Sequence, residues 1–266
     1  MKYNRENVLR NIVKSEDRLI AARLLDKAEF TVRTNRLVHS DFLDPRQLKM
    51  AQMVLESAGI CRYRFYGGYS SAERSVVLFI PDFTDEDDLK QYCSTILKVI
   101  EITPLMRGSL SHRDYLGSLM GLGIRRSVAG DIIVEKEKCR IIVLSDIAEY
   151  IAGNLDKVGN IGVSAKISDI MELSVPAPAK KEIRAAVSSL RLDCICASAF
   201  GLSRSKASDF IKGGKVQFNW ETATDTDRLV GEGDTLSMRG KGRAVLEKVI
   251  GRTRNDRISI IITKYV

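Results

Sequence analysis

The chain has 266 residues, of which 44% are hydrophobic and 29% are charged, a balance that is typical of folded globular domains. Its length predicts two domains, or three small ones. The apolar content is sufficient for real cores, which excludes wholesale disorder. No uninterrupted apolar run approaches the roughly 20 residues of a membrane-spanning helix. We therefore expect a folded protein without membrane insertion.

The first residues and the cysteines indicate the cellular compartment. Residues 1–17 are polar and include acidic side chains, whereas a secretory signal needs an apolar stretch and an organellar transit peptide avoids acids. The five cysteines are an odd number, which fits reduced thiols better than a disulfide framework. These observations predict a cytoplasmic protein.

The net charge of +8 is unevenly distributed along the chain. Residues 180–266 contain 17 Lys and Arg against 10 Asp and Glu, whereas residues 1–179 contain 25 against 24. Such asymmetry predicts an anionic partner for the C-terminal third, either nucleic acid or an acidic membrane surface. A solvated basic face without a partner is the plain alternative.

Residues 1–74 predict a mostly helical N-terminal region. Apolar residues near helical spacing predict a helix over 5–28, and a short strand is expected over 31–38. The pair Asp44-Pro45 is typical of a helix start, and Gly59 is expected to end that second helix.

Residues 75–173 predict a middle domain of mixed helices and strands. Strands are expected at 76–80, 99–103, 131–134, 139–144 and 163–170, the third and fourth forming a hairpin. Helices are expected to begin with Thr84 and Ser111 as N-caps and to cover 146–156. The mixture favours an α+β fold, a small ferredoxin-like or RRM-like sheet with helices on one face.

Residues 174–179 predict a linker, because Pro176 and Pro178 discourage both helix and central strand. Residues 180–266 then predict a third domain. Its helices are expected over 180–190, from 191 to a stop at Gly201, and from Ser203 as N-cap to Lys212. Its strands are expected at 215–219, 235–239 and 244–250, separated by glycine-containing turns.

The last of these helices begins with groups that suit phosphate. A helix N-terminus offers free backbone N–H groups and a partial positive charge, and the glycines of the basic turn at 240–243 allow close backbone approach. Arg and Lys contact phosphates, whereas Gln and Asn reach bases or 2′-hydroxyls. Solvated charges around two tight turns are the alternative. The residues predicted to contact RNA are Arg191, Ser203, Arg204, Ser205, Lys206, Lys212, Lys215, Gln217, Asn219, Arg239, Lys241 and Arg243.

The order of these residues resembles a known RNA-binding domain. The segments are Arg-Leu-Asp at 191–193, Leu-Ser-Arg-Ser-Lys-Ala at 202–207, Ile-Lys-Gly-Gly-Lys-Val at 211–216, Gly-Asp at 233–234 and Arg-Gly-Lys-Gly-Arg at 239–243. Together they resemble the domain named after small-subunit ribosomal protein S-four, also called the alpha-L motif. Many members have Val-Asn-Gly where this chain has Phe218-Asn219-Trp220. Trp220 either stacks on a base or covers the sheet.

The middle of the chain carries a narrower resemblance. Ser-His-Arg-Asp-Tyr-Leu-Gly-Ser-Leu-Met-Gly-Leu-Gly-Ile-Arg-Arg at 111–126, followed by Gly-Asp-Ile at 130–132, resembles the middle-domain signature of the bacterial YlmH family. The resemblance implies a second RNA-binding-like domain in the middle of the chain. It also implies ribosome quality control on the large subunit, with tRNA, and a link to cell division in Gram-positive bacteria.

Basic residues near this signature suggest a second RNA surface, made of Arg107, Arg113, Arg125 and Arg126; a solvated helix face is an equal alternative. The triplet His-Arg-Asp at 112–114 mimics a kinase catalytic loop, but the asparagine that the motif requires is Leu119. The cysteines and the two histidines show no zinc-ligand spacing. We expect neither a metal nor a cofactor.

These patterns predict a non-enzymatic protein that binds structured RNA. The resemblance to the YlmH family implies that this RNA is rRNA of the large ribosomal subunit, with tRNA as a further candidate. The triplet Arg-Leu-Asp at 191–193 resembles the catalytic aspartate motif of pseudouridine synthases, but it lies inside the RNA-binding domain itself, where we expect Asp193 to anchor the fold by accepting hydrogen bonds. One alternative is nevertheless an RNA-modifying enzyme similar to those synthases. It would use the C-terminal domain to deliver RNA. The other is a division-site scaffold that binds protein.

Overall fold

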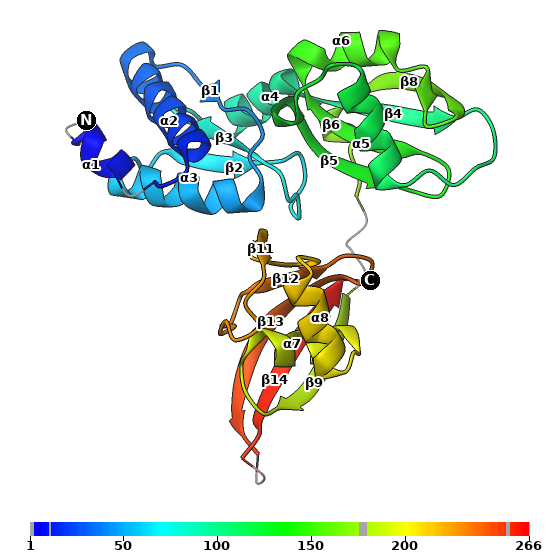
Figure 1. Ribbon diagram of the computed structural model, residues 1–266. Helices are drawn as coiled ribbons and strands as arrows, with labels where there is room; N and C mark the ends of the chain where they lie inside the picture. Colours follow the sequence, from blue (N-terminus) through cyan, green and yellow to red (C-terminus); the bar gives the residue numbers. More distant parts are fainter. Residues whose placement is uncertain (1–2, 11, 176–179, 254–255, 266) are drawn as a thin grey trace. The chain divides into compact units, whose positions relative to one another are not determined.

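The computed structural model describes residues 3–10, 12–175, 180–253 and 256–265. The chain forms two compact units, residues 1–175 and 176–266 (Figure 1). The last four residues of the expected linker, 176–179, lie outside the described residues.

The N-terminal part of the first unit packs helices on a small antiparallel sheet of order β1-β3-β2. Its elements are α1 (Arg5–Arg10), α2 (Ser15–Thr34), β1 (Val38–His39), α3 (Pro45–Ser57), β2 (Tyr63–Tyr66) and β3 (Val76–Phe79). Asp44 caps α3, as expected: its side chain accepts a hydrogen bond from the Gln47 backbone N–H, and the Gln47 side chain accepts one from the Asp44 N–H. Strand β3, which we expected in the middle domain, belongs to this sheet instead.

Two predictions for this region are wrong. The single helix over 5–28 is two helices. The expected strand over 31–38 is largely helical, because α2 continues to Thr34 before Asn35 ends it in the left-handed conformation (φ 51°). The β-branched residues Thr31 and Val32 favour a strand by propensity, but burial of Thr31 one turn beyond Ala28 extends the helix.

The middle of the chain forms an antiparallel sheet of order β5-β6-β4-β8-β7. Its elements are β4 (Leu97–Pro104), α5 (His112–Gly121), β5 (Ala129–Val134), β6 (Cys139–Leu144), α6 (Ser145–Asn154), β7 (Lys157–Val158) and β8 (Ile161–Asp169). The succession β4-α5-β5-β6-α6-β8 is the β-α-β-β-α-β arrangement of ferredoxin-like folds. Helices α5 and α6 cover one face (Figure 1), where Tyr115 and Ile151 are buried against the strands. The predicted fold class is therefore confirmed.

The other face of this sheet is also partly covered. Helix α4 (Glu86–Ile96), which is capped by Asp85 rather than by the predicted Thr84, packs on it. Leu89 of α4 shares one buried cluster with Ile142 of β6 and with Leu78 of β3. The N-terminal sheet and the middle sheet are thus joined through a common core, which makes residues 1–175 one compact unit.

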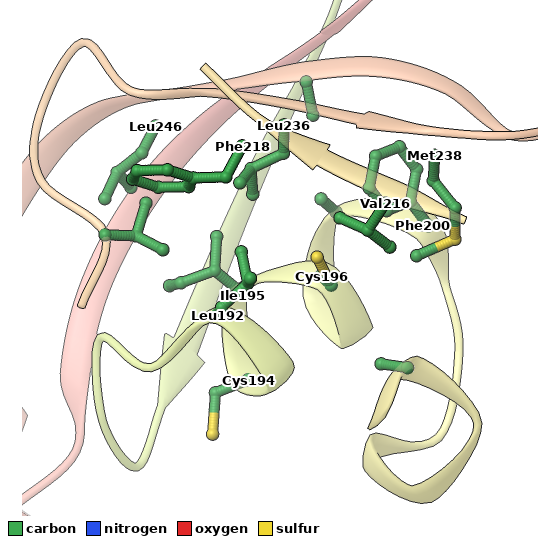
Figure 2. Close-up of a cluster of buried hydrophobic side chains, with 14 of the residues drawn as sticks. Leu192, Cys194, Ile195, Cys196, Phe200, Val216, Phe218, Leu236, Met238 and Leu246 are labelled. Carbon is green, nitrogen blue, oxygen red and sulfur yellow. The ribbon is translucent and has the colours of Figure 1, made fainter. Parts of the chain in front are cut away.

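The C-terminal unit packs two helices on a six-stranded sheet of order β11-β10-β12-β13-β14-β9. Its elements are β9 (Lys180–Val187), α7 (Leu192–Phe200), α8 (Arg204–Lys212), β10 (Val216–Phe218), β11 (Glu221–Ala223), β12 (Thr235–Met238), β13 (Gly242–Arg252) and β14 (Ile258–Tyr265). The core lies between α7 and the strands, where Leu192, Ile195 and Cys196 meet Phe218 and Leu236 (Figure 2).

The helix predicted over 180–190 is wrong, because this segment is strand β9. Its residues include good helix formers, but it pairs antiparallel with β14 along its whole length. The pairing places Ile183 and Ala185 against the core and leaves the alternate side chains exposed. A partner strand some 75 residues away therefore overrides the local preference.

Candidate nucleic-acid interface

The N-terminus of α8 is an exposed, positively charged surface. Ser203 caps the helix, and its hydroxyl accepts a hydrogen bond of 3.3 Å from the Lys206 backbone N–H. Arg204, Ser205 and Lys206 are exposed in the first turn. Because the first N–H groups of a helix lack intrahelical partners and carry partial positive charge, the charge at this end of α8 is of the sign that suits an anion such as phosphate.

The buried carboxylate of Asp193 holds this surface in place. It accepts hydrogen bonds of 2.8 Å from the Cys194 backbone N–H and from Nε of Arg204, and Arg191 approaches it at 3.4 Å. Burial works to raise the pKa of Asp193, but the hydrogen bonds from Arg204 and Arg191 outweigh it and hold that pKa below its usual value. Asp193 therefore anchors the fold and aligns two predicted RNA contacts.

The two arginines differ in how much of the guanidinium remains available. Arg204 is 51% exposed beside Asp193. Arg191 is 33% exposed and also pairs with the exposed Asp227. Each arginine therefore contacts Asp193 and also keeps part of its side chain exposed to solvent, and the exposed part is larger in Arg204.

A second basic cluster, made of Lys215, Arg239 and Lys241, is brought together by the pairing of strands in the C-terminal sheet. Strands β10 and β12 pair with Val216 opposite Met238, and the Arg239 backbone N–H donates a 3.0 Å hydrogen bond to the Lys215 carbonyl. Two residues that are 24 positions apart thus become neighbours. The ammonium of Lys215 lies 5.4 Å from the ring centroid of Phe210 on α8, and Lys215 is exposed.

The turn between β12 and β13 adds Lys241 to this cluster. Gly240 and Gly242 on either side have φ values of 77° and 92°, a conformation that favours glycine. Lys241 is exposed, whereas Arg243, the next predicted contact, is half-buried on β13. Lys212 at the end of α8 and Gln217 on β10 are exposed as predicted contacts must be.

Asn219 is the predicted contact whose side chain is already engaged. Its Nδ2 donates to Asp234 at 2.7 Å, and its Oδ1 accepts from the Thr235 backbone N–H at 2.9 Å. Asn219 and Trp220 both have positive φ, 49° and 65°, and connect β10 to β11 as a two-residue turn of type I′. The structure therefore favours a turn-forming role for Asn219.

Trp220 occupies the turn position that Gly usually fills, and its side chain is half-buried. Another aromatic contact was absent from the sequence prediction: the guanidinium of exposed Arg228 lies 4.1 Å from the Phe218 ring centroid. No sequence signal marks Arg228, because the contact depends on the long 224–234 connection returning to the sheet.

The four arginines of the predicted second surface fall into two groups. Arg107 and Arg113 are exposed in the β4–α5 loop and in the first turn of α5. Arg125 and Arg126 instead line a cavity with residues of the N-terminal region. Arg126 is half-buried and donates to the carbonyls of Ala129 and Gly130 at 2.5 and 2.9 Å. Burial, together with nearby Arg74, lowers its pKa to about 10.

The face of the middle sheet opposite α5 and α6, called the open face below although α4 covers part of it, lacks the aromatic residues on which RRM domains stack bases. Strands β4, β5, β6 and β8 contain no Phe, Tyr or Trp. On this face Glu101 pairs with Lys138 at 2.6 Å, and Arg140 pairs with Glu135. The middle domain thus has an RRM-like topology without an RRM-like stacking surface.

Metal and membrane features are absent from the part of the chain that the structure describes. It has no group of three or more His, Cys, Asp or Glu side chains that could hold a metal ion. None of its helices combines the length and apolar character that crossing a bilayer requires.

A basic C-terminal domain with two helices follows a ferredoxin-like domain, and the family models that match these two parts define a multidomain RNA-binding protein of the S4 class. Family models match in that order: "YlmH, N-terminal" at 16–82, "Putative RNA-binding domain in YlmH" at 95–172 and "S4 domain" at 190–236. The chain is 34% identical over 247 residues to "Ribosome-associated protein quality control protein P2" of Bacillus subtilis (strain 168), covering 92% of this chain and 93% of that protein. The chain therefore belongs to the YlmH family.

A solved structure, "Cell division protein ylmH from Streptococcus pneumoniae", is also similar to this chain. The match has a TM-score of 0.49 and 21% sequence identity, and it covers 60% of this chain and 94% of that one.

Proposed function

We propose that this protein is a non-enzymatic factor of ribosome quality control that works in the cytoplasm. It binds rRNA of the large subunit, and tRNA, through its C-terminal domain. The observation that carries this proposal is the exposed set of cations at the α8 N-terminus and the β12–β13 turn, in the domain that holds nearly all of the excess positive charge. The name of the Bacillus subtilis relative supports the ribosomal setting.

The RNA contacts that we assign to this surface come from three places. The start of α8 provides Ser203, Arg204, Ser205 and Lys206, with Arg191 beside them. The far end of α8 and the segment into β10 provide Lys212, Lys215 and Gln217, and the β12–β13 turn with the start of β13 provides Arg239, Lys241 and Arg243. The ferredoxin-like domain contributes a second, weaker contact through Arg107 and Arg113. Two modest sites on one chain gain affinity when both can bind together.

Ribosome co-sedimentation at two salt concentrations tests the proposal. The intact chain should sediment with the large subunit at low salt and dissociate steeply as salt rises, because each phosphate contact releases counterions. The variant Lys206→Glu/Lys241→Glu should lose binding. The control Lys181→Glu/Lys248→Glu, which makes the same charge change at exposed positions of β9 and β13, should retain it.

Two other experimental outcomes would contradict the proposed function and favour an alternative one. Failure of the intact chain to sediment at low salt contradicts ribosome binding and favours a protein partner, such as a division-site component. A single modification missing from rRNA of cells without the protein, detected by mass spectrometry, contradicts the non-enzymatic proposal and favours the RNA-modifying alternative.

A further inference from the structure

The first unit contains a cavity of about 360 Å³ between α2, the segment 40–47 and residues 125–127. Five basic residues line it: Arg23, Lys27, Arg74, Arg125 and Arg126. Only two acidic residues, Asp41 and Asp44, line it with them, and Asp44 is already engaged as the N-cap of α3. Positive charge is therefore in excess at this cavity, although the whole of residues 1–179 is nearly neutral.

Two of these arginines are half-buried side by side. Nε of Arg74 and a terminal nitrogen of Arg126 donate to the same Ala129 carbonyl, at 3.0 and 2.5 Å. Arg74 also donates to the carbonyls of Phe42 and Arg126 at 3.2 and 3.3 Å. In the described part of the chain, neither guanidinium forms a salt bridge with a carboxylate.

The nearby carboxylate of Asp131 accepts its hydrogen bonds from groups other than these two guanidinium groups. It accepts hydrogen bonds from the Tyr69 hydroxyl at 2.8 Å and from the backbone N–H groups of Glu73 and Arg74 at 2.7 and 3.1 Å. Like charges that are partly desolvated without a carboxylate partner are destabilising. The charges of Asp131 and Asp44 act on these guanidinium groups only from beyond ion-pair distance, so an anionic ligand in the cavity would add counter-charge in direct contact.

The basic residues at the opening of the cavity also favour an anionic ligand. Arg23 and Arg125 are exposed and Lys27 is half-buried. Within the described residues none of these three side chains makes a hydrogen bond or an ion pair. They therefore contribute charge at the opening without an evident structural contact.

The remaining lining indicates what kind of anion fits. Ile20, Leu24 and Leu43 give the cavity an apolar part beside the cationic one, and its volume lies in the range of small-molecule sites. An apolar surface next to several Arg side chains suits a nucleoside that carries a phosphate.

We propose that this cavity binds one nucleotide, with its phosphate at Arg74, Arg125 and Arg126 and its nucleoside against the apolar part. The nucleotide is either free or an unstacked unit of an RNA strand. Binding of a free nucleotide goes beyond the proposed ribosomal function, and binding of an RNA unit deepens it by adding a contact in the first unit.

Calorimetric titration of the intact chain tests the proposal. One set of titrations uses the four ribonucleoside 5′-monophosphates, and the other uses a 5′-phosphorylated RNA tetranucleotide. The variant Arg23→Gln/Arg125→Gln changes only exposed rim residues and should bind at least about tenfold more weakly, because charge-assisted contacts of this kind each contribute on that order. The control Arg18→Gln/Arg33→Gln removes the same charge from exposed positions of α2 outside the cavity and should bind as the natural chain does.

Binding of monophosphates identifies a free-nucleotide site, and binding of the tetranucleotide alone identifies an RNA contact; both support the cavity. No binding of either probe at millimolar concentration, or equal affinities of the rim variant and its control, overturns the proposal.

The variant Lys206→Glu/Lys241→Glu separates this proposal from the ribosomal one. If it loses ribosome binding but keeps the nucleotide affinity, the cavity is an independent site. If instead it loses the nucleotide affinity while the rim variant keeps it, the nucleotide is bound by the C-terminal domain and the cavity proposal is wrong.

Discussion

The ferredoxin-like domain and the C-terminal domain both match RNA-binding families, but they present different surfaces. The C-terminal domain exposes cations on a helix start and on a glycine-flanked turn. The ferredoxin-like domain covers part of its open sheet face with α4 and pairs the charges on the rest. A match to an RNA-binding family therefore does not by itself give a sheet face that suits RNA, because exposed charge that no neighbouring charge neutralises is what attracts phosphate.

The largest expected effect contrasts charge reversal in the two domains. Lys206→Glu/Lys241→Glu should weaken RNA affinity by roughly a hundredfold and reduce the slope of log affinity against log salt by about two, because two phosphate contacts are lost. Arg107→Glu/Arg113→Glu, in the ferredoxin-like domain, should weaken it less. Filter binding to rRNA fragments over a salt series measures both, and equal losses would contradict the asymmetry between the domains.

The next effect concerns the anchor of the C-terminal surface. Asp193→Ala should destabilise the C-terminal unit by about 2 kcal/mol, because the Cys194 N–H and the two arginines lose a buried acceptor, although both arginines can turn toward solvent. Hydrogen exchange followed by mass spectrometry should show faster exchange in 180–265 and not in 12–175. Asp227→Ala, at an exposed partner of Arg191, is the control and should change stability by less than about 1 kcal/mol.

A smaller effect separates turn residues from contact residues. Asn219→Ala should cost the C-terminal unit about 1–2 kcal/mol, because two internal hydrogen bonds are lost at a positive-φ position, while RNA affinity of the folded protein stays the same. Gln217→Ala should instead weaken RNA binding and leave the stability of the C-terminal unit unchanged. Thermal unfolding and RNA binding, measured on both variants, distinguish the roles; a loss of affinity in folded Asn219→Ala would restore Asn219 as a contact.

The pH dependence of stability should also differ between variants. The pKa of Asp193 is lowered in the folded state, so its contribution is present above its unfolded pKa of about 3.9 and is lost as the pH falls through the folded value. Acid should therefore destabilise the C-terminal unit of the natural chain in this window, and Asp193→Asn should show a weaker dependence there. Circular dichroism from pH 6 to pH 2 records the difference; identical profiles would contradict it.

The smallest effect is expected on the open face of the middle sheet. Glu101→Gln removes one partner of the half-exposed pair with Lys138 and should change stability by less than about 1 kcal/mol. RNA affinity should not fall. A marked loss of affinity would show that this face binds RNA after all.

Local signals were sufficient for much of the C-terminal surface. Gly201, Ser203 and the glycines at 240 and 242 occupy the positions that their conformational preferences require, because caps and tight turns depend on a few neighbouring residues. The sequence predicts Asn219 as an RNA contact, whereas the structure favours a turn-forming role for it, because its hydrogen bonds to Asp234 and Thr235 join segments that the sequence does not show to be close.

The sequence by itself determined the positions of α3, α5, α7 and α8, the β5–β6 hairpin, the charge asymmetry and the family, because each of these depends on short-range patterns or on composition. Only the tertiary structure decided that 180–187 is a strand, that β3 belongs to the N-terminal sheet, that α4 covers the middle sheet, and that Arg74 lies beside Arg126. These features depend on partners far away in the chain, whose pairing and burial outweigh local preferences.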